Sequence, residues 1–260
     1  MKLREYYLGY RSAQAEEADY SAADLVRIEK GARLIREMTA QWPGPLRVLD
    51  IGCGPGTLHR FLDQARYHLI GTEINPALCR EAASHYRAVI HLDLESGWAL
   101  KDETIHAIFA AALLEHIFDY HGLLNECNRV LRHSGLIVVE VPNLGYWKEV
   151  RKLVLRKHPH WANDMQHLHM WTEGKLVQML TWHGFRVVHR ECDSLNLPLL
   201  RRNGFLERRL SSWGRNLIVA ALKERRTRVA DARMPSLPAA VRYLDRRTVE
   251  IMDDGGRPSS

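Results

Sequence analysis

Short apolar runs alternate with segments of helical periodicity along the first half of the chain. The apolar runs predict buried strands at residues 46–52, 67–73, 88–94, 104–114 and 136–143. Between them, apolar residues recur three or four positions apart, which predicts helices at residues 21–41, 57–65, 76–87 and 120–132. Strands that alternate with helices pair in parallel through crossover connections. The pattern therefore predicts an α/β fold, a doubly wound sheet with helices on both faces.

The alternation is interrupted after residue 143 and then resumes. Residues 147–157 place their apolar side chains on one side of a helix whose other positions are mostly lysine and arginine. We interpret this segment as a basic helix that covers the core, and a contact with a membrane surface is the alternative. Further apolar runs at residues 185–191 and 215–223 predict two more strands, which makes about seven.

The same pattern divides the chain into three parts. Residues 1–45 are expected to form a helical cover, followed by a single domain over residues 46–223. Irregular insertions interrupt that domain at residues 143–171 and 193–213. Residues 224–260 are rich in arginine, proline and small residues, so we expect a basic, poorly ordered tail.

The net charge of +6 is distributed unevenly along the chain. Residues 1–142 carry four more acidic than basic side chains, whereas residues 143–223 carry eight more basic than acidic ones. A basic second half favours an acidic partner, such as a phosphorylated substrate, nucleic acid or an anionic membrane surface. A solvated basic surface without a partner explains the same charge equally well.

Cysteine usage and hydropathy bear on where the protein works. The four cysteines are far apart and form no CxxC pair, which argues against a disulfide framework and against a cysteine-based zinc site. The first twenty residues have no apolar signal core, and the chain has no run of 18 apolar residues. We expect a cytoplasmic protein with reduced thiols.

Three glycines follow the first predicted strand, in the order Asp50-x-Gly52-x-Gly54-x-Gly56. The helix expected after them offers unpaired backbone N–H groups and the positive end of its dipole. Glycines at this place let a ligand approach the backbone closely. The dinucleotide fingerprint GxGxxG requires glycine where this chain has Thr57, so a nicotinamide cofactor is the weaker alternative.

Acidic residues follow the next two predicted strands. Glu73 ends the second strand, where an acid can accept hydrogen bonds from both ribose hydroxyls, and Asp93 follows the third, where it can accept an adenine amino proton. Asp50 would repel a phosphate but suits a nearby ammonium or sulfonium group. The three acids outline a nucleoside that carries a positive charge. For Asp93, the structural alternative is a helix cap.

Five segments occur along the chain in the order VLDIGCGPG, GTEINP, HLDLES, ALLEHIFD and NECNRVLRHSGLIVVEVPN. In this order they resemble the S-adenosylmethionine-dependent methyltransferases of the Rossmann-like class, over about residues 25–222. DMQHLHMWT, a helix and then HGF are similar to the branch of methyltransferase domains that act on small molecules, quinones and sugars. The resemblance implies S-adenosylmethionine as cofactor and a mostly parallel sheet of seven strands with the last one antiparallel. It also implies that the two insertions cover the substrate.

Carried onto this chain, the resemblance assigns a cofactor site at the ends of four strands. Gly52, Gly54 and Gly56 would face the amino-acid part of the cofactor, with Asp50 supporting their loop. Glu73 would bind the ribose. The other assigned residues are Ile74 beside Glu73, Asp93 and Leu94 at the adenine, and Ala110 and Ala111 near the methionine part.

Methyl transfer needs donor and acceptor held in line and, for a hydroxyl acceptor, a base. His116 follows the fourth strand beside the expected methyl site, and imidazole titrates near neutral pH, so His116 is the first candidate base. Its alternative role is to close the site by packing. His167 is the second candidate, although both His167 and His169 can instead serve a structural loop.

Two departures from the family pattern lie at the fourth strand. His106 stands where aspartate often opens that strand, and Ala112 stands where a polar or acidic residue is common. A metal ion held by Glu115, His116 and one later histidine is an alternative, since imidazole and carboxylate suit several ions. The missing carboxylate at Ala112 argues against it, and we expect no metal.

The sequence leaves the methyl acceptor open. We expect O-methylation of a small-molecule, glycan-like or lipid-linked acceptor with a negative group, because the basic residues of the second half lie where this family varies its substrate cover. One alternative is a nucleic-acid methyltransferase, which predicts steep salt dependence and an RNA-binding appendage that we do not see. Another is a non-catalytic regulatory protein that binds S-adenosylmethionine. A peripheral membrane contact and the oligomeric state stay open.

Overall fold

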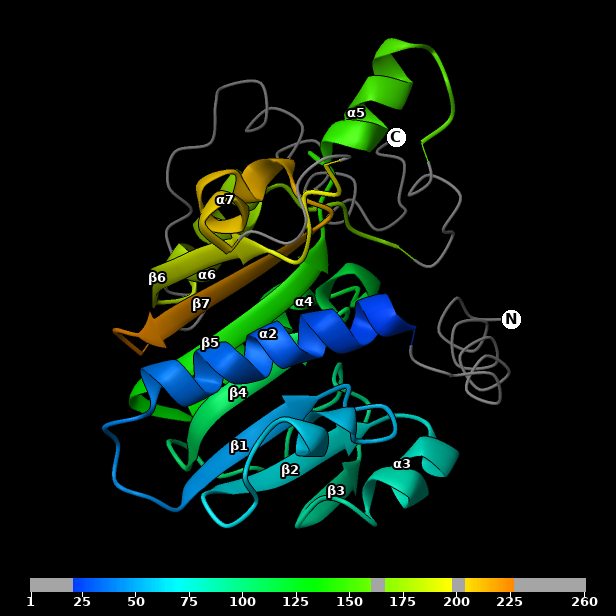
Figure 1. The fold of residues 1–260 in the computed structure, drawn as a ribbon. Coiled ribbons are helices and arrows are strands. Elements are labelled where there is room, and N and C mark those ends of the chain that lie inside the picture. Colours follow the sequence, from blue (N-terminus) through cyan, green and yellow to red (C-terminus); the bar gives the residue numbers. More distant parts are fainter. Residues whose placement is uncertain (1–20, 160–166, 198–203, 227–260) are drawn as a thin grey trace, which may run out of the picture. The chain divides into compact units, whose positions relative to one another are not determined.

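The computed structural model describes residues 21–159, 167–197 and 204–226. Seven strands form one sheet in the order β3–β2–β1–β4–β5–β7–β6 (Figure 1). The strands are β1 (Leu46–Ile51), β2 (Tyr67–Glu73), β3 (Ala88–His91), β4 (Ile105–Ala111), β5 (Leu131–Pro142), β6 (Phe185–Cys192) and β7 (Asn216–Lys223).

The directions of the strands confirm the predicted sheet. β1 to β5 pair with one another in parallel, whereas β7 pairs antiparallel with both β5 and β6. The last strand is therefore inserted between two earlier ones, as the resemblance implies. The strand order reverses between β1 and β4, and open α/β sheets bind their ligands outside the carboxyl ends of the strands at such a reversal.

Helices cover both faces of the sheet, and each face has its own apolar cluster. α2, α3 and η2 contribute to one cluster, and Figure 1 shows α2 lying across that face. α4, α6 and η3 contribute to the cluster on the other face. The α-helices are α2 (Ala22–Met38), α3 (Pro76–Ala82), α4 (Tyr120–Val130), α5 (Trp147–Val154), α6 (Glu173–Trp182) and α7 (Gly204–Arg209), and the 3₁₀ turns are η2 (Thr57–Arg60), η3 (Leu114–His116) and η5 (Ser211–Trp213).

The predicted helix at residues 57–65 is wrong over most of its length. Only the short turn η2 forms, because Gly56 before it is left-handed, with a φ of 87°, and has no side chain to cap a helix. Asp63 then closes the next turn by accepting a hydrogen bond from the N–H of Ala65 at 3.0 Å. Local hydrogen bonds of this kind compete with helix formation.

Helix α2 begins at a capping box and packs closely on β4. Ser21 Oγ accepts a hydrogen bond from the N–H of Asp24 at 3.3 Å, and Asp24 Oδ2 accepts one from the N–H of Ser21 at 3.0 Å. Nearer the middle of the helix, a Cβ on Gly31 would lie 2.2 Å from Cε2 of Phe109. The helix can approach the sheet this closely only because residue 31 is glycine.

We expect Gly31→Ala to destabilise the protein by about 1–3 kcal/mol. Alanine is better than glycine in a helix by about 1 kcal/mol, but the ring of Phe109, which is 2% exposed, would have to leave its packed position and shift toward the adjacent cavity. Gly174→Ala in α6 is the matched control, because nothing lies within 4 Å of a Cβ there. Denaturant unfolding measures both variants, and equal stability changes would contradict the argument.

The two ends of the chain lie largely outside the described residues. This applies to residues 1–20 of the predicted helical cover and to residues 227–260 of the predicted tail. Helices α5 and α7 lie within the two predicted insertions. None of the helices in the described part of the chain combines the length and the apolar character needed to span a membrane.

Candidate cofactor and active site

The glycine loop joins β1 to η2 at the carboxyl edge of the sheet. Gly52 donates a backbone hydrogen bond to Thr72 O at 2.9 Å, and Gly54 donates one to Glu73 Oε2 at 3.0 Å. The φ angles are 68° at Gly52, 54° at Gly54 and 87° at Gly56. Residues with a side chain rarely adopt such angles, so the backbone conformation by itself favours glycine at all three positions.

Packing within the protein explains two of these glycines further. A Cβ on Gly52 would lie 2.9 Å from Cδ1 of Leu113, and a Cβ on Gly56 would lie 3.1 Å from Cα of Ala82. The glycines therefore make room for the chain's own atoms. The case for a ligand rests on the acids and the cavity beside the loop.

Glu73 is 9% exposed and holds the loop through its carboxylate. Its Oε1 accepts hydrogen bonds from the N–H groups of Ile74 at 2.8 Å and Asn75 at 2.9 Å, and its Oε2 accepts the bond from Gly54. A carboxylate has about four lone-pair sites. Glu73 therefore has a structural role, and room for one further hydrogen bond rather than the two expected from ribose.

Asp50 lies near the end of β1 and is 5% exposed. The hydroxyl of Tyr86 donates a hydrogen bond to Asp50 Oδ2 at 2.5 Å. Burial raises the pKa of Asp50 to about 7; the bond from Tyr86 opposes this rise, and the negative charge of Glu73 adds to it. The carboxyl group therefore titrates near neutral pH, and a cation beside it would favour the ionised form.

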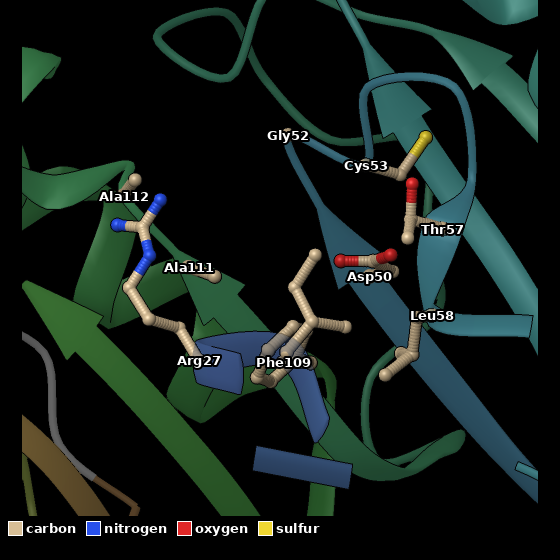
Figure 2. Close-up of a pocket in the computed structure, with 10 residues that line it drawn as sticks. Arg27, Asp50, Gly52, Cys53, Thr57, Leu58, Phe109, Ala111 and Ala112 are labelled. Carbon is tan, nitrogen blue, oxygen red and sulfur yellow. The ribbon is translucent and has the colours of Figure 1, made fainter. Parts of the chain in front are cut away.

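A cavity of about 170 Å³ lies between the glycine loop and α2 (Figure 2). Figure 2 shows Asp50 of β1 on one side of it and Arg27 of α2 on the other, with Ala111 and Ala112 at the end of β4. Sites for whole ligands measure roughly 300–1,000 Å³. The cavity therefore has the size for one part of a nucleoside cofactor, and it presents a carboxylate and a guanidinium to that part.

The residues Arg27 and Glu140 were missed by the sequence interpretation. Arg27 Nη1 donates to both carboxylate oxygens of Glu140 at 3.1 Å, and Arg27 also pairs with Asp24. Burial raises the pKa of Glu140, which is 0% exposed, while the charge of Arg27 opposes that rise. The sequence signal that could have indicated this pair was Glu140 itself, a single glutamate inside the apolar run at residues 136–143.

Ala112 adopts a backbone conformation that is uncommon for a residue with a side chain, with a φ of 47°. Two hydrogen bonds hold it there, because its N–H donates to Glu140 O at 3.1 Å and to Glu140 Oε2 at 3.0 Å. Strained residues of this kind cost about 1–3 kcal/mol and cluster at functional sites. The strain lies at the cavity wall, two residues before the start of η3.

The side chains of β4 alternate between the two faces of the sheet. Phe109 and Ala111 line the cavity. Ala110 is fully buried in the apolar cluster on the other face. Of the two alanines assigned to the methionine part, only Ala111 is therefore in place to touch a ligand in the cavity.

The residues assigned to the adenine region have roles in the fold. Asp93 Oδ1 accepts a hydrogen bond from the N–H of Glu95 at 3.0 Å, which caps its own turn. Leu94 is 8% exposed and packs in the apolar cluster. The carbonyl of Ile74 lies 2.9 Å from His91 Nε2, which ties the end of β2 to β3.

Glu115, His116 and His167 lie together after β4. His116 Nε2 is 3.9 Å from Glu115 Oε1, and the rings of His116 and His167 have centroids 5.0 Å apart. The side chain of Glu115 is 1% exposed and that of His116 is 15% exposed. The structure therefore brings both predicted catalytic histidines to one place, next to a buried carboxylate at ion-pair distance from His116.

His169 has a structural role instead. The N–H groups of Leu168 and His169 both donate to Glu115 O, at 2.7 and 3.1 Å, which fastens their segment to η3. His169 Nε2 lies 3.3 Å from Phe118 O, and its ring packs edge-on against Tyr120. Burial lowers the pKa of His169.

The cluster of Glu115, His116 and His167 also has the composition of a metal site. One ligand atom from each residue lies within 4.8 Å of the other two. In a tetrahedral site with bonds of about 2.0–2.2 Å, ligand atoms are about 3.3–3.6 Å apart. The side chains would have to move closer to bind an ion, and Ala112 supplies no fourth ligand.

Comparisons with known proteins identify the family of the chain. A family profile described as a methyltransferase domain matches residues 23–190. A ubiquinone biosynthesis O-methyltransferase of Bradyrhizobium diazoefficiens is 32% identical over 111 residues, or 40% of this chain and 43% of that protein. A trans-aconitate 2-methyltransferase of Methylobacterium nodulans is 27% identical over 132 residues, or 48% of this chain and 51% of that protein. The match spans about half the length of these curated relatives.

Solved structures show the same fold. The 1,6-didemethyltoxoflavin-N1-methyltransferase of Burkholderia thailandensis, with S-adenosylhomocysteine bound, has a TM-score of 0.60 and 15% identity over 86% of this chain and 92% of that one. The CurJ carbon methyltransferase has a TM-score of 0.58 and 17% identity over 84% of this chain and 59% of that one. The family profile covers more than half of the sequence. The chain therefore belongs to the family of methyltransferase domains, in the Rossmann-like class that uses S-adenosylmethionine.

Proposed function

We propose that the protein transfers a methyl group from S-adenosylmethionine to an oxygen atom of a small-molecule, glycan-like or lipid-linked acceptor. When bound, this cofactor supplies a methyl group on a positively charged sulfonium centre. The observation that carries the proposal is the pair of buried carboxylates, Asp50 and Glu73, beside the glycine loop at the reversal of the sheet. The two carboxylates repel each other when both are ionised, and a cationic nucleoside beside them would offset that repulsion.

The residues around the loop fit the parts of this cofactor. Glu73 has one lone-pair site left for a ribose hydroxyl, and Asp50 lies at the cavity, where it would face the ammonium group. Arg27 on the opposite wall would face the carboxylate of the methionine part. The remaining assigned contacts are the loop glycines and Ala111 at the methionine part, Ile74 beside the ribose, and Asp93 and Leu94 at the adenine.

His116 is the proposed general base, with His167 as a positioning residue. His116 accepts the proton of an acceptor hydroxyl as the new carbon–oxygen bond forms. Buried Glu115, 3.9 Å away, stabilises the protonated imidazole, and the ring of His167 packs beside it. The segment after His167 is fastened to η3 by backbone hydrogen bonds, so both rings sit on a constrained part of the site.

The presence of a base bears on the acceptor atom. The proteins compared above include an O-methyltransferase, an N1-methyltransferase and a carbon methyltransferase, so family membership alone leaves the atom open. A neutral amine can attack with its lone pair before it loses a proton, whereas a hydroxyl is a poor nucleophile unless a base assists. A histidine supported by a buried carboxylate therefore favours oxygen.

The affinity for S-adenosylmethionine is expected to rise about tenfold between pH 6 and pH 8, since Asp50, with a pKa of about 7, attracts the cation only when ionised. In the absence of cofactor, Asp50 of the folded chain stays protonated at pH values between its ordinary pKa of 3.8 and about 7. In the unfolded chain, Asp50 is ionised over the same pH range. The free energy of unfolding therefore falls as pH rises through that window. Calorimetric titrations across this range measure the affinity.

Asp50→Asn is the control for this pH dependence. The variant cannot titrate at this position, so it should bind more weakly at pH 8 and lose the tenfold rise. A rise of the same size in wild type and variant would assign the titration to another ionisable group of the protein.

The proposed function is tested first by calorimetry with S-adenosylmethionine and S-adenosylhomocysteine on the purified full chain. Micromolar affinity would support the cofactor assignment. Extracts are then screened for transfer of a labelled methyl group. A product in the small-molecule or lipid fraction supports the proposal, label in nucleic acid would support the alternative substrate, and binding without any labelled product would favour a regulatory protein.

A further inference from the structure

The apolar face of helix α5 points away from the core, which is opposite to the orientation that its sequence pattern predicts. The pattern places its apolar side chains against the core. In the structure, Val154 is 76% exposed, Leu155 is 58% exposed and Leu153 is 48% exposed, whereas Glu149 is 8% exposed. The helix therefore does not cover the core with its apolar face, and presents that face to the solvent.

Contacts at the first turn hold α5 in this orientation. Trp147 Nε1 donates a hydrogen bond to Leu195 O at 2.6 Å. The carboxylate of Glu149 accepts hydrogen bonds from Lys152 Nζ at 2.9 and 3.1 Å. The bond from Trp147 anchors the first turn to the fold, whereas Leu153 and Val154 at the end of the helix and Leu155 just after it are exposed, followed by Arg156 and Lys157.

The charge around this apolar face has one sign. Residues 147–157 contain five basic side chains and one acidic side chain. The acidic one, Glu149, is buried and paired with Lys152. Arg151, Arg156 and Lys157 are exposed next to the exposed aliphatic residues. The surface that α5 offers is therefore apolar and positive.

A second exposed apolar site lies at the base of α5. Trp213 of η5 is 57% exposed, and Leu210 before it is 39% exposed. Asn143, which connects β5 to α5, donates hydrogen bonds from Nδ2 to Ser212 O at 2.9 Å and Gly214 O at 2.7 Å. The turn that carries Trp213 is thus fastened to the segment from which α5 starts.

We propose that α5 and the Trp213 turn dock on an anionic lipid bilayer. An interfacial helix gains from apolar burial in the acyl boundary and from attraction between its lysines and arginines and acidic headgroups. Nucleic acid would neutralise the charge but leave four aliphatic side chains in water, because it binds through phosphate contacts and aromatic stacking. Tryptophan is also a residue that membrane interfaces favour.

The position of α5 connects this surface with the acceptor. α5 follows the carboxyl end of β5, the sheet edge at which the parallel strands β1 and β4 also end (Figure 1). The glycine loop follows β1 at this edge, and Ala112 follows β4. Docking there brings that edge to the headgroup region. The acceptor is therefore an amphiphilic molecule that resides in the bilayer. This substrate class rests on the proposed methyl transfer, whereas the lipid contact does not.

Vesicle flotation of the full chain tests the contact. The probes are vesicles of phosphatidylcholine alone and vesicles with about one third phosphatidylglycerol. We expect binding at least about tenfold tighter to the anionic vesicles, weakened when salt is raised from about 0.1 M to about 0.5 M. The double variant Val154→Ser, Leu155→Ser should lose at least about tenfold in vesicle affinity without any change in charge.

Matched controls separate apolar insertion from charge. Val188→Ser removes a side chain that is 37% exposed on β6 and should leave binding unchanged. The pair Arg156→Gln, Lys157→Gln should weaken binding more than the pair Arg60→Gln, Arg80→Gln, which removes the same charge elsewhere on the surface.

The outcomes that overturn the lipid contact are distinct. Full binding by the serine double variant would show that the aliphatic residues do not insert. Tighter binding to RNA than to anionic vesicles would assign the surface to nucleic acid. A dimer in solution that this variant dissociates, without vesicle binding, would assign it to a second copy of the chain. Calorimetry on the same protein measures S-adenosylmethionine binding separately, so a failure of the lipid contact and a failure of the proposed methyl transfer can be told apart.

Discussion

Replacing Glu73 with alanine is expected to weaken S-adenosylmethionine binding by at least about 100-fold. The variant loses the carboxylate that we propose accepts a hydrogen bond from the ribose. It also removes the acceptor of three backbone N–H groups, those of Gly54, Ile74 and Asn75, which shape the glycine loop. Both losses act on the same ligand, because the loop forms one wall of the cavity. Calorimetry measures the affinity.

The control for Glu73→Ala is Glu81→Ala, which removes an exposed acid from nearby α3 and should leave the affinity unchanged. Circular dichroism and the melting temperature report whether Glu73→Ala is folded. If it is not, Glu73→Gln provides the test, since it keeps one acceptor for the loop while removing the charge. Wild-type affinity in a folded Glu73 variant would refute the assignment of this residue to the cofactor.

Replacing His116 with alanine is expected to lower turnover by about 10²- to 10⁴-fold while the affinity for the cofactor changes little. The reason is that the hydroxyl proton then loses its proposed acceptor. The rise of kcat with pH, which reports deprotonation of the base in the complex, should disappear with it. Single-turnover transfer of a labelled methyl group, with the acceptor found by the extract screen, measures the rate.

Two comparisons make the His116 result specific. His133→Ala changes an exposed histidine at the amino end of β5 and should leave turnover unchanged. Treatment with a chelator should also leave the wild-type rate unchanged, because the proposal assigns His116 to proton transfer. A rate that falls with the chelator and returns with Zn²⁺ or Co²⁺ would make the cluster of Glu115, His116 and His167 a metal site instead.

Most of the fold was predictable from local patterns. All seven strands and the helices α2, α3, α4 and α5 fall within or overlap segments predicted from apolar runs and helical periodicity, and α6 lies where the family resemblance places a helix. The failure at residues 57–65 has a local cause as well, since Gly56 and Asp63 favour turns that the apolar periodicity of that stretch concealed.

The site was predictable in part. The glycine loop, Asp50 and Glu73 come together as expected, because the carboxyl ends of neighbouring parallel strands meet at one edge of the sheet. The sequence did not indicate that Glu73 would use most of its hydrogen-bonding capacity within the protein, nor that Arg27 would pair with Glu140, 113 residues away.

By itself, the sequence determined the sheet, its crossover connections and the family of the chain, because these depend on apolar periodicity and on short motifs of adjacent residues. Only the tertiary structure decided the pKa of Asp50, the approach of His167 to His116 and the outward face of α5. The physical reason is the same in each case. Burial, desolvation and ion pairing depend on neighbours supplied by distant parts of the chain, which a local pattern does not contain.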